Sequence, residues 1–387
     1  MQTTYTVQKL LQKLSDWKEY IPATTIYTLE KLKVCRTSTL GYHLYACNEQ
    51  TCSKQQMQYH SCRNRHCPNC GGLKKEQWVE DRTRELLPCT YYHVVFTVPH
   101  QLNGLFMGNQ KVLYNLLFDS SAYVLKKFSD DKQYMGAQTG IVSILHTWGQ
   151  QLSYHPHIHC IVTGGGLGNR NQWVLGKKTK YRSLYPVKAM QVVYRARMIE
   201  QLKDYILSGK VKVADKDTTI KELNLLYSKE WIVYAKQPFG GPQQVIEYLG
   251  RYTHKVAISN HRIKHIDQDN KVTFEYKNYS KGGQKATMTL EGKEFIRRFS
   301  QHILPKGLFK IRSYGIYTNY KRTSRINGIL KTLKLPLHPP KVDTPWYIKF
   351  ASRYGKDPLL CPCCKKGKLE LVSITYKQKP ITINKRE

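Results

Sequence analysis

The stretch SYHPHIHCIVTGGG, residues 153–166, constrains the fold more than any other part of the sequence. Its three histidines stand at alternate positions, and an apolar run follows them directly. In a β-strand, side chains two residues apart share a face and lie about 7 Å apart along the chain. The pattern therefore predicts a strand over residues 157–163 that holds His157 and His159 on one face, with Ile158 and Cys160 on the other.

Two imidazoles on one strand face can chelate a single metal ion. His155 would lie about 13 Å from His159 along an extended strand, so one ion cannot easily take all three histidines. His155 also precedes Pro156, which holds the chain extended but interrupts strand pairing. We therefore predict His157 and His159 as metal ligands. Taken without other context, a hydrogen-bonded histidine pair on a sheet face is an equally good interpretation.

A carboxylate or an amide would complete such a metal site. Gln150 in HTWGQQLSY lies across an expected turn if a strand over residues 141–147 pairs with the histidine strand. We predict Gln150 as the third ligand, in competition with Gln151, His146 and Gln244. This set leaves coordination positions open, so a bound Mg²⁺ or Mn²⁺ could polarise a phosphate. Imidazole ligands favour transition ions over Mg²⁺.

Five of the eleven cysteines lie within residues 47–70, and the pairs CNEQTC and CPNC suit thiolates on tight turns. Residues 1–15 lack the apolar block of a signal peptide, so we expect reduced thiols and bound metal before disulfides. Such a module has little core of its own, and zinc would largely hold it folded. The predicted Zn²⁺ ligands are Cys47, Cys52, Cys67 and Cys70, with a possible second site of Cys35, His43, Cys62 and His66.

The cluster CPCC at residues 361–364 resembles half of a zinc knuckle that lacks two ligands. His338 or Cys363 could complete it, or it could borrow ligands from elsewhere in the chain.

Tyr248 and Tyr252 in QVIEYLGRYTH are four residues apart and would share one face of a helix. A tyrosine hydroxyl can attack a phosphodiester if its proton is removed and a metal polarises the phosphate. The resulting phosphotyrosine conserves the bond energy, so a free 3′ hydroxyl can reverse the step without ATP. Two packing tyrosines are the ordinary interpretation of this spacing, but the histidine strand and the charge of the chain favour the chemical one.

The chain carries 62 Lys and Arg against 27 Asp and Glu, a net charge of +35 over 387 residues. An excess this large indicates a polyanion partner. The 28 tyrosines, interleaved with basic residues, suit the unstacked bases of single strands. No apolar run reaches about 18 residues, so we expect no membrane span and a cytoplasmic, nucleoid-associated bacterial protein.

The periodicity of the chain predicts an α+β fold. We expect strands over 91–98 and 141–147, helices over 105–127 and 186–207, and a small antiparallel sheet over 256–291. We divide the chain into a helical lead-in (1–34), a zinc-binding module (35–87), a catalytic domain (88–320) and a basic C-terminal region with the CPCC cluster (321–387).

Four segments, HTWGQQLSYHPHIHCIVTGGG, YLGRYTHKVAISNHRI, SCRNRHCPNC and FIRRFSQHILPKGLFKIRSYG, resemble the two-tyrosine HUH transposases of the insertion-sequence 91 family. The resemblance covers residues 35–364, although CNEQTC is wider than the CxxC-like pair of the family. It implies an HUH nuclease domain, in which a central antiparallel sheet flanked by helices carries His157 and His159. It also implies Tyr248 and Tyr252 as nucleophiles, a zinc-binding N-terminal region, and rolling-circle transposition of single-stranded DNA through 5′-phosphotyrosine intermediates.

The expected DNA partner is a single strand or a hairpin at the ends of a mobile element. The chain has no GxxxxGK[ST] motif, so we expect it to depend on a host helicase and the host replication machinery. Two alternatives remain: a plasmid replication initiator or relaxase-type nickase, and a non-catalytic zinc-dependent DNA-binding protein. The oligomeric state is not predicted. Candidate DNA-binding residues are Arg251, Lys255, Arg297, Arg298 and Arg312.

Overall fold

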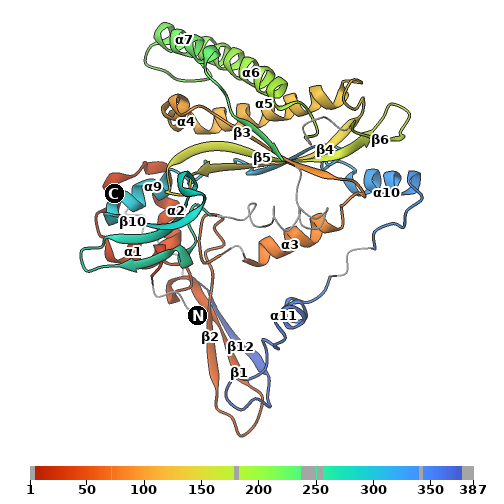
Figure 1. Ribbon diagram of the computed structural model, residues 1–387. Coiled ribbons are helices and arrows are strands. Elements are labelled where there is room, and N and C mark those ends of the chain that lie inside the picture. Colours follow the sequence, from red (N-terminus) through yellow and green to blue (C-terminus); the bar gives the residue numbers. More distant parts are fainter. Residues whose placement is uncertain are drawn as a thin grey trace, which may run out of the picture.

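The computed structural model describes residues 5–70, 72–177, 183–236, 250, 256–339 and 343–376. These residues form three parts: a central sheet with helices on both faces, a small lobe, and a three-stranded arm that projects away from the sheet (Figure 1). The paired strands run antiparallel in all three sheets of the described residues. The predicted α+β class is therefore confirmed.

The central sheet has the strand order β11-β4-β5-β3-β7, and β6 pairs with β5. The strands predicted at 91–98, 141–147 and 157–163 are confirmed as β3, β4 and β5. β5 begins earlier than expected and includes Pro156, beside a register shift between His146 and Trp148 where the ladder is already irregular. The bounds are β3 Tyr91–Thr97, β4 Gln138–Trp148, β5 Tyr154–Leu167, β6 Trp173–Leu175, β7 Val233–Lys236 and β11 Ile311–Gly315.

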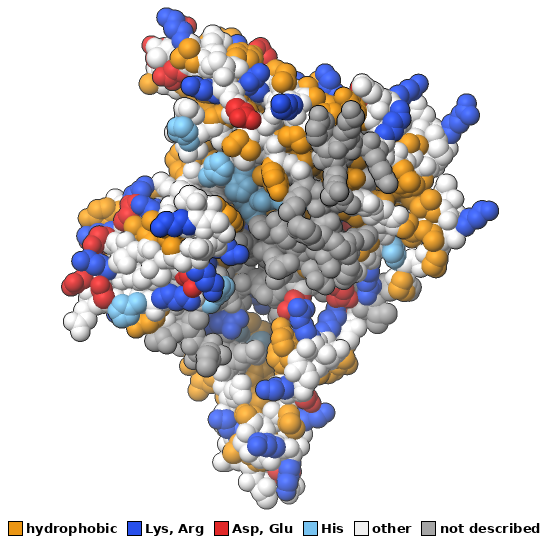
Figure 2. All heavy atoms as spheres, in the orientation of Figure 1, with side chains coloured by type: hydrophobic (Ala, Val, Ile, Leu, Met, Phe, Trp, Pro, Cys, Tyr) orange, Lys and Arg blue, Asp and Glu red, His pale blue; other side chains and the backbone are white. Residues whose placement is uncertain are grey.

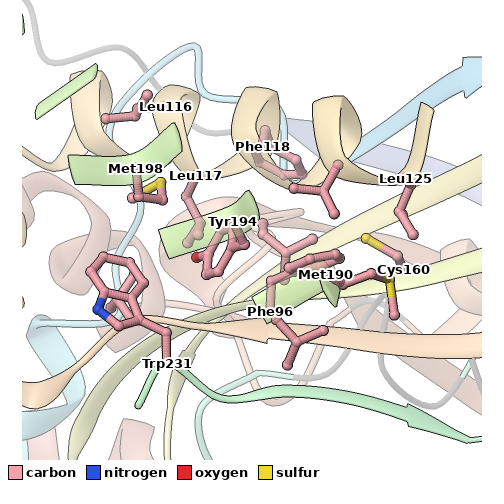
Figure 3. Close-up of a cluster of buried hydrophobic side chains, with 14 of the residues drawn as sticks. Phe96, Leu116, Leu117, Phe118, Leu125, Cys160, Met190, Tyr194, Met198 and Trp231 are labelled. Carbon is pink, nitrogen blue, oxygen red and sulfur yellow. The ribbon is translucent and has the colours of Figure 1, made fainter. Parts of the chain in front are cut away.

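One face of the central sheet packs against the two long helices α5 and α6. Phe96 of β3 and Cys160 of β5 are fully buried there, with Tyr194 and Met198 of α6 above them (Figure 3). The helices predicted at 105–127 and 186–207 are thus confirmed. The helices on this side are α4 Asn103–Gly108, α5 Gln110–Asp130, α6 Val187–Leu207 and α7 Lys216–Leu225.

The opposite face of the same sheet has a smaller apolar cluster. Ile144 and Ile161 pack there with Ile326 and Ile329 of α10 (Arg322–Thr332), and Trp78 of α3 (Gly72–Thr83) lies against the cluster. Because successive strand residues point to opposite faces, the apolar run after the histidines supplies both clusters.

The small lobe joins the start of the chain to residues 256–303. Helices α1 (Val7–Lys13) and α2 (Ala23–Lys33) share a core with the second sheet, which has the order β10-β9-β8, and with α9. The sheet predicted over 256–291 is confirmed. The predicted domain boundaries stay a prediction, and packing joins the lead-in helices to this lobe. The other elements are β8 Ile263–Ile266, β9 Val272–Asn278, β10 Gln284–Leu290 and α9 Gly292–Ser300.

The arm consists of β1 (Gly41–Cys47), β2 (Gln55–Tyr59) and β12 (Leu369–Tyr376), in the order β12-β1-β2. It therefore pairs strands from the two ends of the described chain, and α11 (Trp346–Tyr354) lies on the path between α10 and the arm (Figure 1). Within the described ranges, no helix is both long and apolar enough to cross a bilayer.

Candidate active site

Strand pairing places three histidines together on the face of the central sheet opposite α5 and α6. His157 lies directly across from His146 of β4, and His159 stands two residues further along β5. The ligand nitrogens of the three side chains all lie within 4.8 Å of one another. Figure 2 shows histidine side chains reaching the surface between the central sheet and the small lobe. The predicted pair is thus joined by a third imidazole.

Hydrogen bonds orient two of these rings. The Nδ1 atom of His157 lies 2.7 Å from the carbonyl oxygen of His155, so that nitrogen carries the proton and donates it. The Nδ1 atom of His159 lies 2.8 Å from Nε2 of His93 on β3. Both contacts use Nδ1 and leave Nε2 for a metal ion. Outer hydrogen bonds of this kind fix the ring orientation of metal-binding histidines.

Burial favours the neutral imidazole at two of these histidines. It lowers the pKa of His157 to about 4, and the pKa of His93 to about 4. The side chains of His146 and His159 are also buried. A neutral imidazole has a lone pair for a metal ion at pH 7, whereas an imidazolium has none. The three residues therefore fit a divalent transition ion.

The structure corrects the predicted third ligand: His146, not Gln150, stands beside the histidine pair. Gln150 lies beyond the end of β4, and its side-chain amide donates to the Tyr279 hydroxyl of the lobe at 3.4 Å. The Gln150 carbonyl accepts from the Arg262 guanidinium at 2.5 Å. The reason is strand register, because β4 carries His146 directly opposite His157 before the turn begins.

The ring of His146 is held from one side by Trp148. The two rings are stacked, with their centroids 4.7 Å apart and an interplanar angle of 21°. Trp148 in turn lies under the Lys310 ammonium, 4.9 Å from the ring centre. The end of β4 therefore positions His146 by stacking, while β5 and β3 position the other two histidines by hydrogen bonds.

Several predicted site residues lie outside the described part of the chain. These are the two tyrosines Tyr248 and Tyr252, the competing ligand Gln244, and the basic residues Arg251 and Lys255.

Arg297 and Arg298 of α9 both pair with Glu294 on the same helix, at 2.6 Å and 2.7 Å. Arg298 also donates to the carbonyl oxygen of Gln151 at 3.3 Å. This contact places Arg298 at the turn between β4 and β5, close in the fold to the end of the histidine strand. Its predicted DNA-binding role stays a prediction.

Arg312 lies on β11 but on the other side of the sheet. Its guanidinium stands 4.3 Å from the ring centre of Phe118 in α5, and 3.8 Å from a carboxylate oxygen of Asp119. The sheet therefore separates Arg312 from the face that carries the histidines. Its predicted DNA-binding role stays a prediction.

Eight cysteines gather into two sets of four, which differ from the predicted sets. The prediction joined Cys67 and Cys70 to the CNEQTC pair, and this grouping is wrong. β1 ends at Cys47, so the CNEQTC pair lies in the arm. The two cysteine pairs are close in sequence, but each belongs to a different set of four. The observed sets are Cys35, Cys62, Cys67 and Cys70, and Cys47, Cys52, Cys361 and Cys364.

The first set has the geometry of a tetrahedral zinc site. The sulfur of Cys70 lies 3.5 Å from that of Cys35 and 3.7 Å from that of Cys62, and the thiols are free. Four thiolates bonded to zinc at about 2.3 Å stand about 3.8 Å apart.

The histidines predicted for a second zinc site have other roles. The Nε2 atom of His66 accepts from the Leu304 backbone N–H at 3.3 Å and contacts Arg65 Nε at 3.2 Å. Burial lowers the pKa of His66 to about 3, so the ring stays neutral and joins the zinc module to the segment after α9. His43 packs edge-on against His60, with ring centroids 4.8 Å apart.

Sequence reasoning named His146 only as a competitor and missed His93. Both are histidines within strands that flank β5, and each reaches the site through the pairing register. A histidine in the strand pattern YYHVVFTV was the available signal for His93, but the register of β3 against β5 was not readable from the sequence.

Comparison with known proteins agrees with this geometry. A family model described as "Putative transposase" matches residues 140–324, which include the three histidines. A second, described as "Transposase zinc-binding domain", matches residues 6–98, which include all four cysteines of the first set. The curated protein "Putative transposase y4qJ" of Sinorhizobium fredii is 37% identical, over 89% of this chain and 87% of its own length. The chain belongs to the insertion-sequence 91 family of transposases.

Another relative of this transposase is the "Transposase for insertion sequence element IS801" of Pseudomonas savastanoi pv. phaseolicola. It is 26% identical, over 88% of this chain and 81% of its own. Among solved structures, the conjugative relaxase TrwC in complex with oriT DNA aligns with 42% of this chain and 71% of its own, at 11% identity and a TM-score of 0.23. The predicted family is thus confirmed, together with zinc binding in the N-terminal region.

Proposed function

We propose that this transposase cuts and rejoins single-stranded DNA by a rolling-circle mechanism, with a metal ion held by His146, His157 and His159. The observation that carries the proposal is the convergence of three buried imidazoles, with ligand nitrogens within 4.8 Å of one another, on one face of a sheet. Three histidine ligands leave coordination positions open, unlike a closed structural site.

A Mg²⁺ or Mn²⁺ ion bound there would withdraw charge from a phosphate oxygen and orient the leaving oxygen. An all-imidazole set favours Mn²⁺ over Mg²⁺. The protein's own contribution is orientation: hydrogen bonds at Nδ1, to the carbonyl of His155 and to the His93 ring, leave the Nε2 atoms of His157 and His159 for the ion. Burial lowers the pKa of His157 to about 4, so this ring is neutral at pH 7.

The proposed nucleophiles are Tyr248 and Tyr252. The hydroxyl of one tyrosine loses its proton and attacks the phosphorus of the scissile phosphodiester. A bond from the tyrosine oxygen to phosphorus forms as the bond to the 3′ oxygen breaks, and the 3′ oxygen takes up a proton. The 5′-phosphotyrosine conserves the bond energy, so a second 3′ hydroxyl can reverse the exchange and rejoin the strand without ATP. The second tyrosine serves the other cut.

The proposed substrate is a single strand or a hairpin at the ends of the element. The net charge of +35 favours a polyanion. The affinity of the protein for DNA should fall as salt rises, because its Lys and Arg side chains displace cations that are condensed on the phosphates. Strand displacement during the rolling circle is assigned to a host helicase and the host replication machinery.

The test is a covalent-adduct assay with labelled single-stranded element ends and Mn²⁺. The wild-type protein should form a denaturant-resistant adduct, and the Tyr248→Phe, Tyr252→Phe double variant should form none. His146→Ala, His157→Ala and His159→Ala should each lower cleavage on the order of 10³-fold, because several kcal/mol of transition-state stabilisation depend on the ion.

Two controls sharpen this assay. His155→Ala removes an imidazole from the same strand but from outside the group of three, and it should keep most of the cleavage. DNA binding by the three alanine variants should stay within a few-fold of wild type. An adduct that persists in the double tyrosine variant contradicts the nucleophiles. Equal losses in His155→Ala and His157→Ala contradict the assigned metal ligands.

Joining of a donor end to a second strand separates the transposase from a nickase that acts at one origin. The transposase should transfer the 5′ end to a target 3′ hydroxyl in the same reaction. Cleavage without any transfer, under conditions where both strands are present, would favour a replication initiator or relaxase.

A further inference from the structure

The second set of cysteines comes from opposite ends of the chain. Cys47 ends β1 and Cys52 follows in the turn to β2, whereas Cys361 and Cys364 stand in the turn that precedes β12. The matched transposase regions cover residues 6–98 and 140–324, so they include the first pair only. The set is therefore assembled by the fold, from residues more than 300 positions apart in sequence.

The sulfur geometry of this set is that of a tetrahedral metal site. The Cys47 sulfur lies 3.6 Å from the Cys364 sulfur, and the Cys52 sulfur lies 3.8 Å from the Cys361 sulfur. Each contact joins the N-terminal turn to the C-terminal turn. A tetrahedron of zinc–sulfur bonds of about 2.3 Å has edges of about 3.8 Å, whereas a disulfide would bring two sulfurs to about 2.05 Å.

The C-terminal turn is shaped around its two sulfurs. The N–H of Gly367 donates to the Cys364 sulfur at 3.3 Å, and the Cys361 N–H donates to the carbonyl oxygen of Gly367 at 2.9 Å. Lys365 adopts a left-handed conformation with φ of 55°. Its N–H donates to the carbonyl oxygen of Cys361 at 3.0 Å, which closes the turn. These contacts hold the Cys364 sulfur at a fixed position and supply it with a backbone donor.

Gly367 also leaves room for a partner from the other end of the chain. A Cβ atom at this position would lie 2.5 Å from the Cys47 sulfur, closer than a real Cβ contact allows. The neighbouring residues are clamped as well: Asn48 donates its N–H to the Lys368 carbonyl at 3.0 Å, and its side-chain oxygen accepts from the Lys368 N–H at 2.8 Å. The two turns are therefore complementary in shape.

Apolar packing gives the arm little support. Every residue of β2 is exposed, and so is every residue of β12 after Leu369. The three apolar clusters among the described residues contain no residue of β1, β2 or β12. A three-stranded sheet without a packed face is marginal in water, so a further attachment is needed to keep β12 paired with β1.

We propose that Cys47, Cys52, Cys361 and Cys364 bind a second structural zinc ion, which fastens residues 359–376 to the N-terminal zinc-binding module. Four thiolates fill a tetrahedral site and leave no position for substrate, so the ion is structural. The ends of the chain are thereby linked, and β12 becomes the edge strand of the arm. This inference is independent of the proposed nuclease chemistry.

The test is the number of zinc ions per full-length chain, measured by elemental analysis after dialysis. The wild-type protein should carry at least two, because the three-histidine site can also take zinc. The Cys361→Ser, Cys364→Ser double variant should carry one fewer than the wild type. Cys363→Ser is the matched control, because Cys363 is exposed, lies between the two proposed ligands and belongs to neither set; this variant should carry as many as the wild type. Fewer than two zinc ions in the wild type, or no loss of zinc in the double variant, overturns the proposal.

A second measurement guards against a loss that comes from misfolding. Hydrogen exchange in the double variant should show lost protection in β1 and β12, with β4 and β5 unchanged. Gly367→Ala keeps all four thiols but places a methyl group against Cys47. With a competing chelator, this variant should lose one zinc ion at a lower chelator concentration than the wild type does. Zinc release from Gly367→Ala that matches wild type, or undiminished protection of β12 in the double variant, overturns the proposal. Neither readout depends on DNA cleavage.

Discussion

The histidine site and the cysteine sites differ in what holds their ligands in place. The three histidines stand on β4 and β5, whose other face packs against α5 and α6 in a continuous core. The cysteines stand on turns and strand ends, and those of the arm have no apolar cluster behind them in the described residues. A sheet that is already folded can hold metal ligands in place and leave coordination positions of the ion open. A module with little core needs the metal in order to fold.

Removal of zinc should therefore have the largest effect, and it should be confined to one region. Structural zinc contributes on the order of 10 kcal/mol in small cysteine modules. After treatment with a strong chelator, amides of residues 35–70 and of β12 should exchange rapidly with solvent, while β3, β4 and β5 stay protected. Hydrogen exchange measured by mass spectrometry gives both regions in one experiment. Simultaneous loss of protection in β4 and β5 would show that the regions fold as a single unit.

The two faces of the central sheet offer a comparison within one strand. Phe96 of β3 is fully buried against Tyr194 of α6, with ring centroids 5.0 Å apart. Phe96→Ala should lower the free energy of unfolding by about 3–5 kcal/mol, because it leaves a cavity in the core. Val95→Ala, one residue earlier on the histidine face, should cost about 1 kcal/mol or less. Urea denaturation followed by circular dichroism measures both, and equal losses would mean that the histidine face is packed as tightly as the core.

Much of the fold could be predicted because strand and helix periodicity depend on nearby residues. The alternation in residues 157–163 gave β5, and the apolar spacing of 186–207 gave α6. The same alternation placed His157 and His159 on one face, which is the basis of their proposed metal-binding role.

What the sequence did not give was pairing between distant segments. His146 and His93 join the site through the register of β4 and β3 against β5, and register depends on bulges and turns that leave no periodic signal. The predicted grouping of the cysteines was wrong for the same reason. Cys52 is near Cys67 in sequence, but its sulfur lies beside that of Cys361.

Acid should weaken the junction between sheet and lobe through His302, which is fully enclosed. Its ring lies between the Thr147 hydroxyl at 3.2 Å and the Leu152 carbonyl at 3.2 Å, and burial lowers its pKa to about 4. The unfolded chain binds this proton near pH 6.5, so the stabilisation is complete above pH 6.5 and is lost as the pH falls toward 4. The full loss corresponds to about 3 kcal/mol. His302→Gln, which cannot titrate, should reduce the slope of the unfolding free energy against pH over that window, where the buried His66, His93 and His157 contribute as well. An unchanged slope would mean that His302 does not contribute to the acid sensitivity.

His93 should have the smallest effect, because it acts on the metal site through His159. If His159 binds metal through Nε2, its Nδ1 carries a proton and donates to Nε2 of His93, which accepts because its low pKa keeps the ring neutral. His93→Ala removes the acceptor and should weaken Mn²⁺ binding by about 10–100-fold, the usual cost of losing such an outer partner. His93→Gln places a carbonyl oxygen near the lost nitrogen and should restore most of the affinity. Calorimetric titration with Mn²⁺ measures both variants, with thermal unfolding as the control for folding. If glutamine and alanine weaken binding equally while both proteins stay folded, His93 supports the site by packing and not by orienting His159.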